Sequence, residues 1–372
     1  MSFATNCTDC PLICCIDRLC ALVTVVCILT RSHLKYTVHA CFISAALIII
    51  FLTVQRNLQW TASEPVLRFW SQDLSDMDNF KTSVLRPFMV QRVPGTDGNR
   101  AVQNHIKSFL KSWRVEEDTF VDSTPYGKKK FTNIIATLDP SKPNKIVLAC
   151  HYDSKNFSNY LFIGATDSAV PCGILLQTSK QLQCFLEKSR PNDLTLQLIF
   201  FDGEEAFVEW TGTDSLYGSR HLAARWSSES DPVFNNMTRL DAIREFILLD
   251  LIGTSDTTIP QQFKSTSEIY QVLVNTERLL RTKGYLTGNH TGPIFSGNEN
   301  YGGIEDDHVP FLQRGVDIVH LISSPYPSVW HDPTDDWAHL DFDLIDDFCR
   351  IFRVFIATLM QIQPDTTSCS TK

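Results

Sequence analysis

Two adjacent glutamates, Glu204 and Glu205, follow a predicted strand at the point where the chain turns. The apolar run 194–201 is typical of a buried strand, and Asp202-Gly203 is a turn signal. In an open α/β sheet, ligands bind beyond the carboxyl ends of the strands. Like charges this close need a metal, a proton or a cation to hold them together. Taken alone, however, the pair is better explained as an acidic turn in solvent.

Side chains that bind metals also follow other predicted strand ends or lie in the adjoining turns. They are His151 and Asp153 after 146–150, Asp167 in the segment 164–169, Asp250 after 248–249, and His331 after 316–322. One such strand end is routine, but several in one α/β domain favour a metal site. Imidazole and carboxylate ligands suit zinc, and a catalytic zinc takes three protein ligands and leaves one position open.

The sequence around these residues resembles the animal glutaminyl-peptide cyclotransferases, or glutaminyl cyclases, whose fold is similar to that of the zinc aminopeptidases. The matching stretches are 149–155, 164–172, 200–207, 214–223, 248–253, 301–311 and 329–331. The resemblance extends over residues 65–363, and motifs of this length are specific. It implies a zinc-dependent enzyme with one Zn²⁺ per chain.

The resemblance also implies roles for individual positions. The zinc ligands fall on Asp167, Glu205 and His331. The general acid/base falls on Glu204, with Asp250 and Asp306 as its hydrogen-bonded acidic partners. The substrate-pocket positions fall on Trp210, Glu305, His320, Tyr326 and Trp330. Tyr326 stands where a phenylalanine is expected, and His320, inside an apolar strand, fits a core position equally well.

The implied reaction is the cyclisation of an N-terminal glutaminyl residue, or more weakly a glutamyl residue, of a peptide or protein to pyroglutamate. The α-amine attacks the side-chain carbonyl, and a glutaminyl substrate releases ammonia. A zinc aminopeptidase is the alternative, because the ligand types of His151, Asp167, Glu205, Asp250 and His331 would fill both sites of a two-zinc enzyme. A non-catalytic lumenal scaffold on a peptidase-like fold is a third hypothesis.

Periodic segments of two kinds alternate along the chain. Strands are predicted at 115–121, 131–138, 146–151, 194–201, 246–251 and 316–322, and helices at 96–113, 168–186, 215–226, 266–283 and 342–361. Alternating strands and helices predict an α/β fold with a mixed, mostly parallel central sheet flanked by helices.

Residues 36–54 contain no Asp, Glu, Lys or Arg, and about 20 such residues span a bilayer as a helix. Arg31 and Lys35 on the N-terminal side favour a cytoplasmic N-terminus. The predicted order is a cytoplasmic tail (1–35), a transmembrane anchor (36–54), a stem (55–64), a lumenal catalytic domain (65–365) and a C-terminal tail (366–372). This single-pass type II arrangement resembles the Golgi-resident branch of the family.

Composition and cysteine usage agree with a globular enzyme in the secretory pathway. The chain has 372 residues, 43% of them hydrophobic, and its net charge of -9 argues against a nucleic acid partner. Three sequons, at Asn156, Asn236 and Asn289, are compatible with glycosylation of a lumenal domain. By the resemblance, Cys150 and Cys172 form a disulfide, whereas Cys184 and Cys349 are expected to be buried thiols.

Overall fold

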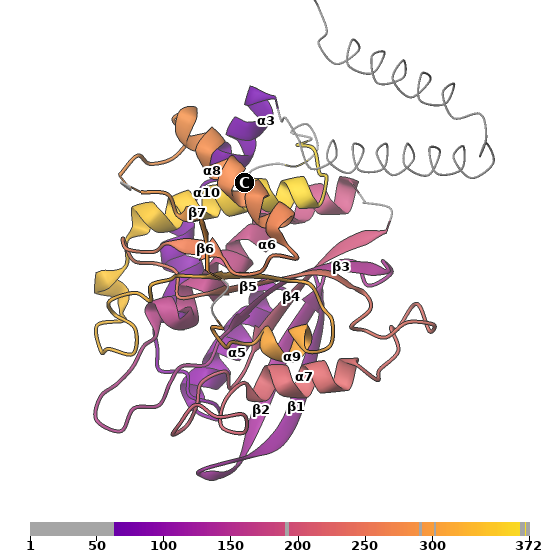
Figure 1. Cartoon of the computed structure of the whole chain (residues 1–372), viewed down its shortest axis with the longest axis vertical. Coiled ribbons are helices and arrows are strands. Elements are labelled where there is room, and N and C mark those ends of the chain that lie inside the picture. The colour runs from indigo at the N-terminus through magenta and orange to yellow at the C-terminus, as the bar shows by residue number, and fades with distance from the viewer. Residues whose placement is uncertain (1–62, 190–192, 290–291, 301–302, 365–368, 370–372) are drawn as a thin grey trace, which may run out of the picture. The chain divides into compact units, whose positions relative to one another are not determined.

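A six-stranded mixed sheet with the order β1-β2-β4-β3-β5-β8 forms the centre of the structure, a computed structural model (Figure 1). Its strands are β1 (Arg114–Thr124), β2 (Gly127–Thr137), β3 (Asn144–His151), β4 (Leu194–Phe201), β5 (Ile243–Asp250) and β8 (Ile318–Ile322). The β1–β2 and β2–β4 pairs are antiparallel, and β4–β3, β3–β5 and β5–β8 are parallel. Only β2 therefore runs against the others, and the carboxyl ends of β3, β4, β5 and β8 meet at one edge.

The structure describes residues 63–189, 193–289, 292–300, 303–364 and 369. The chain divides into the units Met1–Thr61 and Ala62–Lys372, and all the described residues belong to the second. In that part of the chain, no helix is both long and apolar enough to cross a membrane. The predicted tail and anchor, 1–54, lie outside the described residues.

Helices cover both faces of the sheet. The longer ones are α5 (Asp97–Phe109), α6 (Val170–Ser189), α7 (Tyr217–Trp226), α8 (Ser267–Thr282) and α10 (Phe342–Leu359). Helix α6 packs on β3 and β4, with α10 behind it. On the other face, Leu222 and Trp226 of α7 join Phe311 of the short α9 (Val309–Leu312) in a core against the same strands. Figure 1 shows the sheet between these groups of helices.

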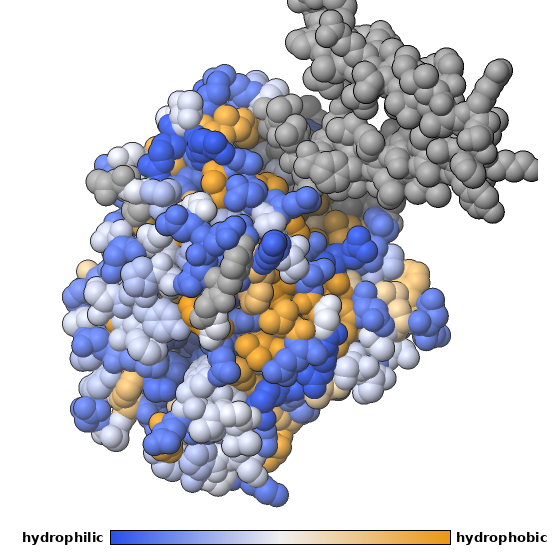
Figure 2. Space-filling view, in the orientation of Figure 1, coloured by the Kyte–Doolittle hydropathy of each residue, from blue (hydrophilic) through white to orange (hydrophobic). Residues whose placement is uncertain are grey.

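Burial explains why the strand prediction succeeds at the centre of the sheet. In β3 and β4, every residue after the first is buried, so both faces of these strands require apolar side chains. The predicted strand 194–201 coincides with β4. Hydrophilic residues cover most of the molecular face in Figure 2, whereas apolar residues gather in its middle.

A small sheet and several short helical segments supplement the strands and helices listed above. Strands β6 (Ile259–Gln261) and β7 (Phe295–Glu299) pair in parallel, and both are too short to show a period. Before α5, the chain forms α3 (Glu64–Arg68), α4 (Met77–Asn79) and the turns Phe69–Asp73, Phe80–Leu85 and Arg86–Phe88. These segments bury Trp70, Phe80 and Phe88 and so belong to the core.

Two disulfides attach other segments to α6. Cys150, in β3, is bonded to Cys172, and Cys184 is bonded to Cys369 near the end of the chain. The expectation that Cys184 is a thiol is therefore wrong. Its partner lies 185 residues away, a separation at which no local sequence pattern indicates pairing. Cys349 is buried and is the free cysteine among the described residues.

We expect alkylation of the denatured but unreduced protein to modify Cys349 and to leave the other cysteines after residue 63 unmodified. Mass spectrometry of the digest should find Cys150 linked to Cys172 and Cys184 linked to Cys369. Reduction before alkylation is the control and should expose all five thiols. Alkylation of Cys184 without reduction would contradict the second bond.

Candidate active site

A pocket of about 650 Å³ opens where the carboxyl ends of the parallel strands meet. Its acidic and imidazole side chains come from five separate segments of the chain: Asp167, Glu204 and Glu205, Asp250, Glu305 and His331. Trp210, Tyr326 and Trp330 supply aromatic walls. The structure thus brings the predicted metal and pocket residues to one place, apart from His320 and Asp306, which lie behind the pocket wall.

The turn after β4 requires glycine at position 203. Gly203 has φ +74°, and a Cβ atom there would come within 2.5 Å of the Phe131 ring. This turn directs Glu204 and Glu205 into the pocket and their backbone N–H groups toward Asp153. The Asp153 carboxylate accepts hydrogen bonds from both, at 3.1 Å and 3.3 Å. Asp153, which the sequence suggested as one of several metal-binding side chains at strand ends, therefore positions the two glutamates.

Asp167 lies on a tightly turned segment before α6. Gly164 begins this segment in the left-handed region, with φ +62°, and the Asp167–Ser168 peptide is cis. Asp167 is buried, and its carboxylate lies between two imidazoles. Its Oδ1 lies 3.0 Å from His151 Nε2, and its Oδ2 lies 3.4 Å from His331 Nε2.

His331 is held by its backbone and by an aromatic surround. Its φ of +54° is uncommon for a residue with a side chain, and such backbone conformations are often found at functional sites. Its ring stacks on Trp330 at 4.0 Å and contacts Phe157 and Phe162 edge-on. Tyr160 donates a hydrogen bond to its carbonyl oxygen at 2.7 Å. Little freedom is left to the imidazole, so its Nε2 is directed at the carboxylates.

The ligand atoms of Asp167, Glu205 and His331 fit a zinc ion. They lie within 4.8 Å of one another, and His331 Nε2 lies 3.4 Å from Asp167 Oδ2 and 3.4 Å from Glu205 Oε1. A tetrahedral zinc with bonds of about 2.0–2.1 Å places neighbouring ligand atoms about 3.4 Å apart. Within the described residues, the buried Oε1 of Glu205 has no hydrogen-bond partner, as expected of an atom kept for a metal.

The electrostatics of this group also suit a cation. Burial alone would lower the pKa of His331, but the carboxylates of Asp167 and Glu205 outweigh it and raise the pKa to about 9. Without a metal, the protonated imidazole of His331 therefore places a positive charge between the carboxylates of Asp167 and Glu205. Metal binding would displace that proton, because a histidine ligand must be neutral.

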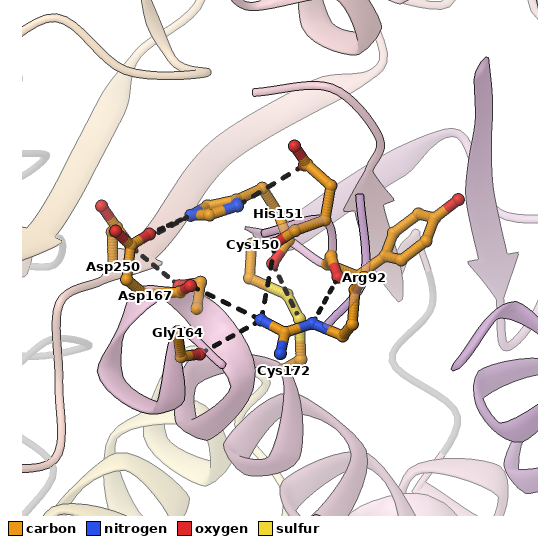
Figure 3. Close-up of a disulfide and its surroundings, with 10 residues drawn as sticks. Arg92, Cys150, His151, Gly164, Asp167, Cys172 and Asp250 are labelled. Atoms are coloured by element: carbon orange, nitrogen blue, oxygen red, sulfur yellow. Dashed lines mark hydrogen bonds and ion pairs between the residues drawn. A yellow bond between two sulfur atoms is a disulfide. The ribbon is translucent and has the colours of Figure 1, made fainter. Parts of the chain in front are cut away.

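A second group of possible ligands adjoins the first. His151, Asp167 and Asp250 also have ligand atoms within 4.8 Å of one another (Figure 3). His151 Nε2 lies 3.4 Å from Asp250 Oδ1, and the same oxygen accepts a hydrogen bond from Ser168 at 2.7 Å. Ligand geometry alone thus allows a second metal, as in the peptidase alternative.

Glu204 precedes the candidate ligand Glu205 and belongs to none of the groups of possible metal ligands among the described residues. Burial raises its pKa well above the usual value, and the negative charges of Glu205, Asp306 and Asp307 add to this effect. Burial likewise raises the pKa of Asp250, to about 6. A buried carboxylate that takes up a proton easily is suited to general acid/base chemistry.

The resemblance implied that His320 lines the substrate pocket, but in the structure it lies outside the pocket lining. Its Nε2 shares a hydrogen bond of 2.7 Å with Asp306 Oδ2, and its ring lies 4.3 Å from that of His308. Both histidines line a neighbouring pocket of about 440 Å³. His320 thus orients Asp306 and does not line the pocket that contains the candidate metal ligands.

The mouth of the pocket is aromatic. Trp210, Tyr326 and Trp330 are 40%, 37% and 41% exposed, although such large rings are usually buried. Tyr326 and Trp330 contact each other at 4.8 Å, and Trp210 donates a hydrogen bond to Glu305 Oε2 at 2.8 Å. Tyr326, in place of the expected phenylalanine, lies in this wall and adds a hydroxyl group. The mouth therefore offers apolar faces together with one carboxylate.

Two cations of the site were not singled out from the sequence. Lys155 donates to Glu205 Oε2 at 3.1 Å, which leaves Oε1 for a metal. Lys155 lies in the stretch 149–155 that resembles the glutaminyl cyclases, and this resemblance could have identified it as a site residue. Arg92 is buried behind Asp167, and no pattern in the sequence distinguishes it from a surface arginine.

Comparison with known proteins gives consistent matches. The model of peptidase family M28 matches residues 133–356. The chain is 44% identical over 293 residues to a glutaminyl-peptide cyclotransferase of Bos taurus, covering 75% of this chain and 81% of that relative. It is 44% identical to a glutaminyl-peptide cyclotransferase-like protein of Mus musculus, over 73% of each chain. The crystal structure of the Macrostomum lignano glutaminyl cyclase superposes with a TM-score of 0.75 at 37% identity, covering 83% of this chain and 98% of that one.

We expect His331→Ala to lose stoichiometric zinc, because two carboxylates alone leave the tetrahedral site incomplete. Zinc content after dialysis is the measurement, and the melting temperature without metal should stay close to that of the parent. His339→Ala is the matched control, since His339 pairs with Asp336 at the surface. A His331→Ala protein that keeps one zinc per chain would refute the ligand assignment.

Proposed function

Because this chain belongs to peptidase family M28 and to the glutaminyl-peptide cyclotransferases, we propose that it closes an N-terminal glutaminyl residue of peptides and proteins into pyroglutamate with release of ammonia. Glutamyl substrates would react more slowly, since they must expel water or hydroxide. The observation that carries this proposal is the position of Glu204, a buried carboxylate beside the metal ligands but not among them. A carboxylate in this position could move a proton between the two nitrogens of one bound glutaminyl residue.

We assign one zinc ion per chain to Asp167, Glu205 and His331. The distances of 3.4 Å from His331 Nε2 to Asp167 Oδ2 and to Glu205 Oε1 support this assignment. When bound, zinc supplies a Lewis acid that polarises the side-chain carbonyl of the substrate. Lys155 neutralises the second oxygen of Glu205 and so keeps that carboxylate turned toward the metal position. These residues determine where the substrate carbonyl lies.

Glu204 carries the proton. The neutral α-amine attacks the γ-carbonyl carbon, and Glu204 takes the proton that the nitrogen loses. The protonated Glu204 then gives this proton to the departing amide nitrogen, which leaves as ammonia. A raised pKa makes both steps accessible; burial raises it most, and the negative charges of Glu205, Asp306 and Asp307 add to this effect. No water is consumed.

The aromatic mouth selects a chain terminus. Trp210, Tyr326 and Trp330 offer faces against which a small, nearly planar ring can pack, and they exclude water from the reacting atoms. Glu305, held by Trp210, offers a carboxylate oxygen to the α-amine. An internal glutamine has no free amine for this contact, so the site favours N-terminal residues.

A zinc aminopeptidase is the second candidate, because His151 and Asp250 extend the ligand set toward a second metal. The two activities differ in their products. A cyclase releases ammonia and leaves the peptide at full length, whereas an aminopeptidase consumes water and shortens it by one residue.

Incubation of the protein with a glutamine-initiated peptide tests the function directly. We expect mass spectrometry to show loss of ammonia without shortening, and an enzymatic assay to detect the ammonia. The same peptide with an acetylated N-terminus is the control and should not react, since its amine is blocked. Release of free N-terminal amino acid would support the peptidase instead, and the absence of both products would favour a scaffold.

Glu204→Gln tests the proton carrier. The change keeps the shape of the side chain and removes its basicity, so kcat should fall by roughly 10²–10⁴. Zinc content should remain at the parent value, because Glu204 is not among the proposed ligands. Glu209→Gln, at an exposed glutamate of the same loop, should have the parent rate. A Glu204→Gln enzyme with normal zinc and a normal rate would remove Glu204 from the mechanism.

We also propose a Golgi location, with residues 36–54 as a type II anchor and the catalytic domain in the lumen. The absence of charge in that segment supports the anchor. Two disulfides in the described domain support an oxidising compartment.

Protease treatment of sealed microsomes should spare the catalytic domain until detergent is added. Digestion without detergent would show the opposite orientation.

A further inference from the structure

Arg92 is fully buried and lies directly behind the proposed zinc ligand Asp167 (Figure 3). It precedes α5, about 75 residues before Asp167 in the chain, and it takes no part in the chemistry proposed above. Its guanidinium group is not directed into the substrate pocket. It is surrounded by backbone carbonyl oxygens instead, and these come from segments that carry site residues.

The guanidinium hydrogen bonds join two segments of the site. Nε donates to the carbonyl of Tyr152 at 2.8 Å, immediately after the end of β3. Nη1 donates to Ile163 at 2.5 Å, and Nη2 donates to Gly164 at 3.1 Å. A further bond of 2.9 Å joins Nη1 to Phe88. One rigid, planar group therefore fixes the strand end that bears His151 and the turn that leads into Asp167.

The turn needs this external support. Gly164 adopts φ +62°, and a Cβ atom there would lie 2.1 Å from the carbonyl oxygen of Asp167. The turn is thus folded tightly on itself, with carbonyl oxygens directed inward. Buried carbonyl oxygens without partners are costly, and Arg92 satisfies several of them at once. Without the guanidinium, the turn would lose the contacts that determine where the Asp167 carboxylate points.

The backbone of Arg92 extends the connection to the other ligand-bearing loop. Its N–H donates to Ser154 Oγ at 2.9 Å, and its carbonyl accepts from Asn99 Nδ2 at 3.0 Å. The same Asn99 amide group donates to Asp202 Oδ1 at 3.0 Å, just before the turn that carries Glu204 and Glu205. The two halves of the metal site are therefore tied to one residue.

We infer that Arg92 is a positioning residue for zinc binding, which holds the Asp167 turn against the end of β3 in the geometry that the metal needs. This inference rests on the zinc site proposed above. The charge of Arg92 also suits the place, because Asp153, Asp167, Asp335 and Glu205 surround it with negative potential. An arginine is required rather than a lysine, since only a guanidinium presents donors to several carbonyls in one plane.

Arg353 shows what a buried arginine does when its role is architectural. It is also fully buried, and it donates to the carbonyls of Trp70 and Ser71 and to Gln181 Oε1. These bonds join α10 to the segment Phe69–Asp73 and to α6, and none of the residues lines the active-site pocket. The chain thus contains a matched control, with the same residue type, the same burial and similar partners.

The test compares Arg92→Lys and Arg92→Met with Arg353→Lys and Arg353→Met. The measurements are the zinc Kd from competition with a chelator, the melting temperature of the metal-free protein, and kcat and KM for a glutamine-initiated peptide at saturating zinc. All four variants should melt at a lower temperature. Only the Arg92 variants should bind zinc more weakly, by about 10–100-fold, the usual effect of removing a group that orients a metal ligand.

The kinetic constants separate positioning from general destabilisation. At saturating zinc, KM in the Arg92 variants should stay near the parent value, because Arg92 does not touch the aromatic mouth. Ser154→Ala provides a milder change, which removes one acceptor from the Arg92 backbone and leaves the guanidinium in place. It should weaken zinc binding several-fold, and it carries the test if the Arg92 variants fail to fold.

Two different failures can be told apart. If the parent protein binds no stoichiometric zinc, the proposed metal site is wrong. If the parent binds zinc and the folded Arg92 and Ser154 variants bind it with the parent affinity, the site stands and the role of Arg92 is refuted. Equal weakening of zinc binding in the Arg353 variants would also refute it, since the effect would then follow stability alone.

Discussion

Repulsion among buried carboxylates is the constraint that the rest of this site depends on. Asp153, Asp167, Glu204, Glu205, Asp250, Asp306 and Asp307 are all buried at one edge of the sheet. So many negative charges, removed from water, would drive one another apart or take up protons. Cationic groups and hydrogen-bond donors around these carboxylates offset the repulsion. They are the imidazoles of His151 and His331, the ammonium group of Lys155, the guanidinium of Arg92, and the backbone N–H groups that face Asp153. A bound zinc ion would complete the same balance of charge.

The parallel strands make this concentration of charge possible. Each strand end of β3, β4 and β5 delivers its acidic or imidazole residues to the same edge, while α6 and α7 bury the apolar faces behind them. Positive φ angles occur in the short turns that carry site residues, at Gly164, Gly203 and His331, and also at Leu251 directly after β5. Such turns are rigid because the core fixes both of their ends. The sheet therefore determines the geometry of the site, and the loops supply the groups that balance its charge.

The sequence alone predicts the parts of this arrangement that repeat along the chain. Apolar runs identify β3 and β4 because both faces of these strands are buried, and ligand-type residues at the strand ends identify the site because parallel strands converge there. It predicts less where the cause is a single long-range contact. The bond between Cys184 and Cys369, the pairing of β6 with β7, and the burial of Arg92 each depend on segments that meet only in the folded chain. His320 is an intermediate case, since the family resemblance implied a place in the pocket and the apolar strand fitted a core position equally well, but neither indicated its hydrogen bond with Asp306.

The same charge balance bears on how a peptidase-like fold carries out a cyclisation. In hydrolysis, a glutamate beside the metal must activate water, so water must reach the reacting carbon. In the proposed cyclisation the nucleophile is the amine of the bound residue itself, so the aromatic walls of the pocket need only hold the side-chain carbonyl close to that amine. On the proposed mechanism, Glu204 needs only to carry one proton, and burial and its acidic neighbours suit it to this task by raising its pKa. Cyclisation and hydrolysis would use the same metal ligands. The difference between them therefore lies mainly in the nucleophile that the pocket walls admit, which is the substrate amine in one case and water in the other.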